Sequence, residues 1–424
     1  MSKAGRAGPD VSTRWLIIAD DLTGAADCAI AFARCGFASR VLWGATRTQD
    51  DVPVVSYNAD SREIGAQGAV GRQMSALDRL HTTDRVLFKK IDSTLRGHPA
   101  AETAAAMALL TGRFGRAFAV LAPAFPAAGR TVVGAHVQVG GVPLEESEIW
   151  RRGHACASAN LVEMLASSGL GAAHVDLATV RRAAGPALQA IAASGGVAVC
   201  DAETDQDLEL IARAALAVDM PGRFFIGSAG LAHALARLGR SSASEPPAPS
   251  PSRGGTLIVV GSTSSVSRAS AERLVSSGDA LRLSAAPRML MEGAPSHRAA
   301  FVEQVAATLS AGRDALVEIG MGDEPPCADG PALAAALASV LAPARPFLGA
   351  LAATGGETAA ALMGALGIDG LHLVEEIEPG VPLGLSLGQI TIPVATKAGA
   401  FGNEGTLSAI AGRLRAVRLK GSFS

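Results

Sequence analysis

The sequence predicts an α/β protein of two domains, each built on a largely parallel sheet, with a ligand cleft between them. Three observations predict this. Short runs rich in Val, Ile, Leu and Phe alternate with Ala-rich runs of helical periodicity. The 424 residues suggest two or three domains at about 150 residues each. Residues 241–255, rich in Ser, Pro and Gly, read as a linker. We therefore expect an N-terminal domain over 1–240 and a C-terminal domain over 256–424.

The N-terminal half contains short apolar runs that predict strands. They cover residues 15–20, 40–43, 52–58, 85–91, 116–121, 197–201 and 224–226. Val70, Met74 and Leu77 recur at helical spacing between the third and fourth of these runs. Continuous apolar strands joined by helical crossovers are typical of a parallel sheet covered on both faces.

The C-terminal half repeats this alternation. Its expected strands cover residues 256–260, 281–284, 315–319, 347–352, 371–374 and 389–396. A last helix carries Leu407, Ile410 and Leu414. Because ligands of open α/β sheets bind beyond the carboxyl ends of the strands, the residues that follow each strand should carry the function.

Composition excludes several classes of function. The formal net charge of -2 provides no global basic field, and 4% aromatic residues provide few rings for stacking bases, so we expect no nucleic-acid partner. No segment has the roughly 20 uninterrupted apolar residues of a membrane span, and residues 1–13 lack an apolar signal region. Five dispersed cysteines indicate neither a disulfide framework nor a zinc site, and they fit a reducing cytoplasm.

Polar residues gather after three strands of the N-terminal half. They are Asp20 and Asp21 in IADDLTGAAD; Asp60, Ser61 and Arg62 in NADSR; and Lys90, Asp92, Ser93, Thr94 and Arg96 in FKKIDSTLRGH. One Asp before a helix is an ordinary N-cap, whereas two adjacent carboxylates suit a metal or a substrate hydroxyl. Arg62 fits either a capping role or the grip of a carboxylate. The lysines, arginines and hydroxyls together suit a small anionic substrate.

Three small-residue turns follow strands of the C-terminal half. The first is GSTSS with Ser262; the second holds Gly355, Gly356, Glu357 and Thr358; the third holds Lys397, Gly399 and Gly402. Backbone N–H groups at such helix starts favour phosphate, and the three turns together form a phosphate cradle more plausibly than any one of them. Neither G-x-x-x-x-G-K-[ST] nor G-x-G-x-x-G occurs in the chain; H-E-x-x-H is absent as well, and the eight His are dispersed without the spacing of metal ligands.

The ordered motifs IADDLTGAAD, NADSR, KKIDSTLRGH, PAFPAAGR, GSTSS, ATGGETAAALM and TKAGAFGNEG resemble the four-carbon acid sugar kinase family across nearly the whole chain. The resemblance implies an N-terminal domain that binds the acid sugar, a C-terminal domain that binds ATP with Mg²⁺, and a product phosphorylated at C4. D-threonate, erythronate and 3-oxo-tetronate are the implied substrates. Ala398 and Ala400 stand where relatives often have Ser and Asn.

Carried onto this sequence, the resemblance implies roles for the motif residues. Asp21 or Asp20 would be the catalytic base. The acid sugar would lie near Asp60, Ser61, Arg62, Lys90, Asp92, Ser93, Thr94 and Arg96. ATP would lie near Ser262, Gly355, Gly356, Glu357, Thr358, Lys397, Gly399 and Gly402. Arg62 or Arg96 would hold the sugar carboxylate, and domain closure across the linker would exclude water.

Two other readings explain the N-terminal motifs. An ATP-independent isomerase or aldolase-type enzyme would use Lys89 or Lys90 on a carbonyl, and a non-catalytic sensor would bind a sugar acid without releasing ADP. Neither requires the three glycine-rich turns of the second half. The oligomeric state stays open, a homodimer being the commonest assembly.

Overall fold

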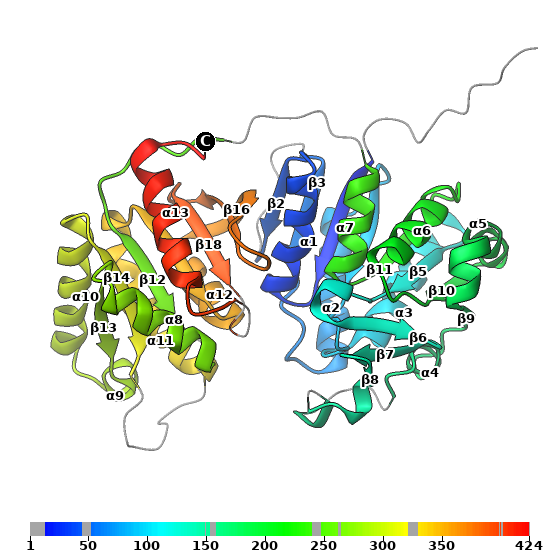
Figure 1. The fold of residues 1–424 in the computed structure, drawn as a ribbon, viewed down its shortest axis with the longest axis horizontal. Helices are drawn as coiled ribbons and strands as arrows, with labels where there is room; N and C mark the ends of the chain where they lie inside the picture. Colours follow the sequence, from blue (N-terminus) through cyan, green and yellow to red (C-terminus); the bar gives the residue numbers. More distant parts are fainter. Residues whose placement is uncertain are drawn as a thin grey trace, which may run out of the picture. The chain divides into compact units, whose positions relative to one another are not determined.

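The computed structural model describes residues 13–44, 52–148, 150–152, 158–239, 247–261, 264–320, 330–397, 399 and 402–423. The chain divides into two compact units, Met1–Ser244 and Glu245–Ser424. Each contains a sheet with helices on both faces (Figure 1). The α/β class and the largely parallel sheets are therefore confirmed.

The main sheet of the first unit consists of parallel strands in the order β2-β3-β1-β4-β11-β5-β10-β9. The strands are β1 (Arg14–Ala19), β2 (Ser39–Leu42), β3 (Val54–Asn58), β4 (Arg85–Lys90), β5 (Phe118–Ala122), β9 (Ala172–Val175), β10 (Gly196–Cys200) and β11 (Arg223–Gly227). The register pairs Ala19 of β1 with Asn58 of β3 and with Lys90 of β4. The segments that follow these three strands therefore begin at the same edge of the sheet.

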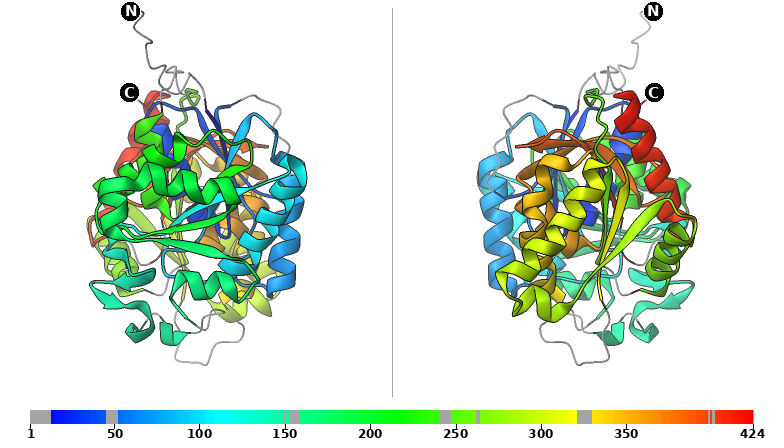
Figure 2. Two further views of the ribbon diagram at one scale, coloured as in Figure 1. Left: turned by 90° about the vertical axis from the view of Figure 1, so that its right-hand side faces the viewer. Right: turned by 90° about the vertical axis from the view of Figure 1, so that its left-hand side faces the viewer.

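Helices cover both faces of this sheet (Figures 1 and 2). One face carries α1 (Leu22–Arg34), α5 (Leu177–Ser194), α6 (Asp205–Leu216) and α7 (Ala229–Leu238), and the other carries α2 (Ala66–Leu80), α3 (Pro99–Phe114) and α4 (Leu161–Ala166). Trp15 of β1 packs against Phe32 of α1 and Phe225 of β11, with ring centroids 5.3 and 5.6 Å apart. Burial of such apolar surface on both faces explains the continuous apolar strands of the sequence.

A small antiparallel sheet lies beside the main one and was missing from the sequence prediction. It consists of β6 (Arg130–Val133), β7 (His136–Val139) and β8 (Val142–Pro143), near the short helices η1 (Pro126–Ala128), η2 (Leu144–Glu146) and η3 (Trp150–Arg152). Strand β9 was missing as well. These strands have four residues or fewer and are partly exposed, so they carry little apolar signal.

The sheet of the second unit runs in the order β13-β14-β12-β15-β18-β17-β16, parallel as far as β18 and antiparallel beyond it. Its strands are β12 (Thr256–Val260), β13 (Ala280–Ala285), β14 (Asp314–Ile319), β15 (Ala350–Thr354), β16 (Ile368–Glu376), β17 (Pro382–Gly388) and β18 (Pro393–Lys397). Helices α8 (Ser265–Ser276) and α13 (Thr406–Lys420) lie on one face, and α9 (Pro287–Met291), α10 (Pro295–Ser310), α11 (Gly330–Leu341) and α12 (Gly356–Ala365) on the other (Figure 2).

Two strand predictions in this unit were wrong in position. The strand expected at 347–352 begins at Ala350, because Pro343 and Pro346 hold the preceding residues in the 3-10 helix η4 (Ala342–Phe347). The strand expected at 389–396 is β18, which starts at Pro393. Strand β17 was not predicted, since its glycines interrupt the apolar pattern.

The second half of the predicted linker is bonded to the second unit. The amide of Ser252 donates to the carbonyl of Arg418 at 2.7 Å, and the amide of Gly255 donates to that of Leu309 at 2.8 Å. Residues 240–246, where the first half of the linker lies, are outside the described residues. No helix in the described part of the chain is long and apolar enough to cross a membrane.

Candidate active site

The acidic pair of the first unit follows β1 directly. Asp20 is 3% exposed, and Asp21 is the N-cap of α1, where its side chain accepts a hydrogen bond from the Gly24 amide at 2.9 Å. The Asp21 side chain is 25% exposed. Capping therefore accounts for one bond of Asp21 and leaves the buried Asp20 carboxylate to be explained by other partners.

Arg62, in the segment after β3, binds both carboxylates of the acidic pair. Its Nε donates to Asp20 Oδ2 at 2.7 Å, and its Nη2 donates to Asp20 Oδ1 at 3.0 Å. Its Nη1 donates to Asp21 Oδ2 at 2.8 Å. The Arg62 side chain is only 11% exposed. Of the two roles that the sequence left open, Arg62 thus grips carboxylates, and these belong to the protein itself.

Lys90 completes the charge balance around the acidic pair. Burial alone would raise the pKa of Asp20, but the charges of Arg62 and Lys90 outweigh burial and hold it below the ordinary 3.8. Burial alone would lower the pKa of Lys90, but Asp20 and Asp21 raise it above 10.5. Asp20 is therefore ionised and Lys90 charged at neutral pH.

The turn after β4 is held by Asp92. Arg96 donates to its two carboxylate oxygens at 2.9 and 2.8 Å, and the Thr94 amide donates to Oδ2 at 3.1 Å. Burial alone would raise the pKa of Asp92, but these bonds and the nearby cations lower it strongly. Leu95 in this turn is buried at a φ of 61°, an uncommon conformation for a non-glycine residue.

Other predicted residues of the first unit take different places. The Asp60 carboxylate is 77% exposed and pairs with Arg72 of α2 at 2.7 Å, which makes it a peripheral member of the site. Ser61 is fully buried, and its hydroxyl donates to Glu102 of α3 at 2.7 Å. Ser93 lies half-buried in the turn after β4.

Sequence reasoning missed the Glu102 carboxylate. It forms an ion pair with Lys89 of β4 at 2.6 Å, and both side chains are at most 2% exposed. A single acidic residue among the alanines of α3 was the available signal. The same ion pair occupies Lys89, so the structure does not favour carbonyl chemistry at that amine.

Three helix starts of the second unit follow neighbouring strands. Helices α8, α12 and α13 begin after β12, β15 and β18, which are adjacent in the sheet. The register pairs Thr354 with Val260 and with Lys397. The positive ends of three helix dipoles therefore lie along one edge, an arrangement that favours phosphate.

Gly261 and Gly355, in the first two turns, lie at positions that require glycine. A Cβ on Gly261 would lie 1.9 Å from Thr358 Oγ1, so only glycine fits there. Gly355, the N-cap of α12, has a φ of 90° and donates its amide to the Lys397 carbonyl at 2.9 Å. Gly356 and Glu357 begin α12, with Glu357 exposed.

Lys397 and Gly399 join the third turn to α8. The Lys397 amine donates to Ser267 Oγ at 3.3 Å and to the Gly399 carbonyl at 3.2 Å. The Ser264 hydroxyl donates to that carbonyl at 2.7 Å. Burial lowers the pKa of Lys397 below 10.5, although Glu378 opposes this effect. Gly402 has a φ of 85°, and Ser262 lies outside the described residues.

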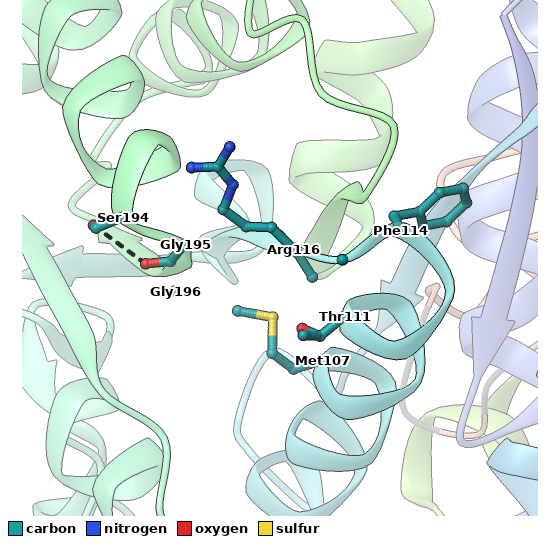
Figure 3. Close-up of a pocket in the computed structure, with 9 residues that line it drawn as sticks. Met107, Thr111, Phe114, Arg116, Ser194, Gly195 and Gly196 are labelled. Carbon is teal, nitrogen blue, oxygen red and sulfur yellow. Dashed lines mark hydrogen bonds between the residues drawn. The ribbon is translucent and has the colours of Figure 1, made fainter.

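Two other features of the described residues do not belong to this site. A cavity of about 680 Å³, lined by Met107, Phe114, Arg116 and neighbouring residues, opens at the amino ends of β5 and β10, the opposite edge of the sheet from Asp20 (Figure 3). Residues 384–388 spell G-x-S-x-G, the pattern of a serine hydrolase elbow. Ser386, however, is buried in the antiparallel strand β17 and donates to the Ile390 carbonyl at 2.9 Å.

The described residues offer few side-chain ligands to a metal ion. Among the described residues no group of three or more His, Cys, Asp or Glu side chains could hold a metal ion. Mg²⁺ in phosphoryl-transfer sites is held chiefly by substrate phosphates and water with one or two carboxylates. The exposed Glu357 at the start of α12 fits such a limited contribution.

Family models match both halves of the chain. A sugar-binding N-terminal domain matches residues 15–235, and a nucleotide-binding C-terminal domain matches residues 257–407. The chain is 45% identical over 409 residues to a D-threonate kinase of Cupriavidus necator, covering 93% of this chain and 96% of that protein. It is 34% identical over 426 residues to a D-threonate kinase of Salmonella typhimurium, with 93% and 96% covered.

More distant relatives carry other substrate names. A 3-oxo-tetronate kinase of Methylobacterium radiotolerans is 32% identical over 418 residues, with 91% of this chain and 95% of that protein covered. A crystal structure of a Haemophilus influenzae protein aligns with a TM-score of 0.74 at 24% identity, covering 94% of this chain and 100% of that one. The structural match shows the fold alone.

Proposed function

This chain belongs to the four-carbon acid sugar kinase family, and we propose that it transfers the γ-phosphate of ATP to the C4 hydroxyl of D-threonate. The observation that carries the proposal is the Arg62 clamp on Asp20 and Asp21, within a chain so similar to D-threonate kinases. Erythronate and 3-oxo-tetronate are the alternative acceptors.

We propose that residues 1–240 bind the acid sugar, that 241–255 link the domains, and that 256–424 bind the nucleotide. The helix starts and small-residue turns after β12, β15 and β18 support the nucleotide assignment. The residues proposed to contact ATP are Ser262, Gly355, Gly356, Glu357, Thr358, Lys397, Gly399 and Gly402. A cleft between the domains stays a prediction, as do a homodimer and a cytoplasmic location.

Asp21 is the proposed base. Both oxygens of each carboxylate accept hydrogen bonds, but Asp20 is buried, whereas the Asp21 side chain is 25% exposed and therefore open to a substrate. In the reaction the C4 oxygen bonds to the γ-phosphorus, the bond from that phosphorus to the bridging oxygen of ADP breaks, and the hydroxyl proton passes to Asp21. Asp20 holds Arg62 in place.

Arg96 is the proposed partner of the substrate carboxylate. Arg62 already binds carboxylates of the protein and is nearly buried, while the Arg96 side chain is 50% exposed beyond its bonds to Asp92. A half-exposed guanidinium offers further N–H donors to an incoming anion. Mg²⁺, bound with ATP, supplies charge neutralisation at the phosphates, and Glu357 is the residue that would help to hold it.

The proposal is tested by measuring ADP release from ATP and Mg²⁺ with D- and L-threonate, D- and L-erythronate and the 3-oxo acids, with Asp21→Asn as the control. We expect turnover with D-threonate and its loss, by about 100-fold or more, in the variant. Binding of an acid without ADP release from any of them would overturn the proposal in favour of a sensor. Conversion of an acid without ATP would indicate an isomerase or aldolase.

A further inference from the structure

The Glu102 carboxylate connects three elements behind the acidic pair. Its Oε1 accepts from the Ser61 hydroxyl at 2.7 Å, and its Oε2 pairs with Lys89 Nζ at 2.6 Å. Its backbone carbonyl accepts from the Gln73 side chain of α2 at 2.9 Å. Helix α3 is thereby joined to β4, to α2 and to the segment that follows β3.

This network ends beside Arg62. The amides of Ser61 and Arg62 both donate to the Asp20 carbonyl, at 2.9 and 3.2 Å. The Ser61 hydroxyl is held on its other side by Glu102. Backbone and side-chain bonds therefore fix the residue immediately before Arg62, whose guanidinium must reach Asp20 and Asp21 together.

Stability alone does not require this ion pair. Removing two charges from water costs free energy that their attraction only partly returns, and apolar pairs of similar volume are often as stable. Lys89 has no exposed surface and so cannot touch a substrate. The buried Lys89–Glu102 pair beside the segment that carries Arg62 is better explained by a role in holding that segment in position.

We propose that Glu102, oriented by Lys89, is a positioning residue that holds Ser61 and thereby sets the Arg62 clamp on the acidic pair. The inference rests on the proposed function. The essential element is the acceptor that Glu102 offers to Ser61, and Lys89 neutralises and orients that acceptor.

Three variants test the proposal. Ser61→Ala leaves the ion pair in place and removes its link to Arg62. Lys89→Met/Glu102→Gln keeps an acceptor for Ser61 without charge, and Lys89→Met/Glu102→Leu removes the acceptor. Ser56→Ala is the matched control, because Ser56 of β3 is as fully buried as Ser61 and its hydroxyl donates to the Ala25 carbonyl at 2.8 Å.

We expect Ser61→Ala and the Leu variant to lose about ten-fold or more in kcat, with the KM for ATP unchanged. The Gln variant and Ser56→Ala should keep kcat within about three-fold. A kcat that follows the melting temperature across all four variants, or a Ser61→Ala enzyme with full kcat, would overturn the inference. If the Leu variant does not fold, Ser61→Ala decides. Absence of turnover in the unaltered enzyme contradicts the proposed function instead.

Discussion

Gly24, in the first turn of α1, places no side chain between the proposed base and Lys90. A Cβ built on Gly24 would lie 2.5 Å from Asp21 Oδ1 and 2.5 Å from Lys90 Nζ. Ordinary contact begins near 3.4 Å. In Gly24→Ala both groups must therefore move by about 1 Å, and both are ends of side chains that can move without displacing backbone.

The two effects of this substitution on stability nearly cancel. Weakening the Asp21 cap costs about 1 kcal/mol, while alanine in place of glycine gains about 1 kcal/mol of helix propensity. The catalytic rate gains nothing that offsets the displacement, because a shift of about 1 Å in catalytic groups can lower the rate by about 100-fold. We expect Gly24→Ala to keep the melting temperature and to lose about 100-fold in kcat.

The assay is steady-state ADP release with D-threonate and ATP, together with thermal denaturation of each variant. Gly71→Ala is the control, since Gly71 lies in α2 with nothing within 4 Å of its built Cβ. It should gain up to about 1 kcal/mol of stability and keep its kcat. A Gly24→Ala enzyme with full kcat would refute the assignment of Asp21 as the catalytic base.

Three further changes have distinct expected outcomes. Arg96→Gln should raise the KM for D-threonate about ten-fold or more and leave the KM for ATP unchanged, because a hydrogen bond to a charged group contributes about 1.5–3 kcal/mol. An unchanged KM for D-threonate in steady-state kinetics would contradict the role of Arg96 in binding the substrate carboxylate. ATP affinity, measured by calorimetry, should fall as pH rises through the alkaline range below 10.5, because the lowered pKa of Lys397 means that its amine loses its charge earlier. Lys397→Arg should flatten this pH dependence. An equal slope in both proteins would exclude Lys397 from the residues that contact ATP. Asp314→Asn should lower the free energy of unfolding of the second unit by about 3 kcal/mol, because the buried Asp314 pairs with Arg415 and Arg418. Urea denaturation measures this change. A loss below about 1 kcal/mol would show that the two arginines find other partners.

The sequence predicts the strand ends well because chain order and topology determine them. Asp20 follows the apolar strand β1 and Lys90 ends β4, and parallel strands bring such positions to one edge. Short, partly exposed strands such as β7 lack this signal, and glycines interrupt it in β17. The errors in the predicted fold therefore fall where burial is partial or where backbone conformation overrides hydrophobic pattern.

Partner choice within the site was beyond the sequence. The motif NADSR shows that an arginine is present but does not show which group it binds. Only the structure distinguishes the nearly buried Arg62 from the half-exposed Arg96. Ser61 likewise reads as a substrate contact, although its hydroxyl faces Glu102, forty-one residues away. Such pairings depend on side-chain directions across different elements, for which local spacing gives no information.

The low pKa of Asp20 bears on how an acidic pair can serve phosphoryl transfer. A carboxylate that Arg62 and Lys90 keep ionised is a weak base. Catalysis through the loose transition state of phosphoryl transfer, however, depends mainly on orientation of the hydroxyl and on stabilisation of charge. The cations Arg62 and Lys90 keep Asp20 ionised, and the hydrogen bonds from Arg62 hold both carboxylates in place, so that Asp21 needs only to orient the hydroxyl and to accept its proton late. The Arg62 clamp is thus better understood as preorganisation of the acceptor site than as a means of making a strong base.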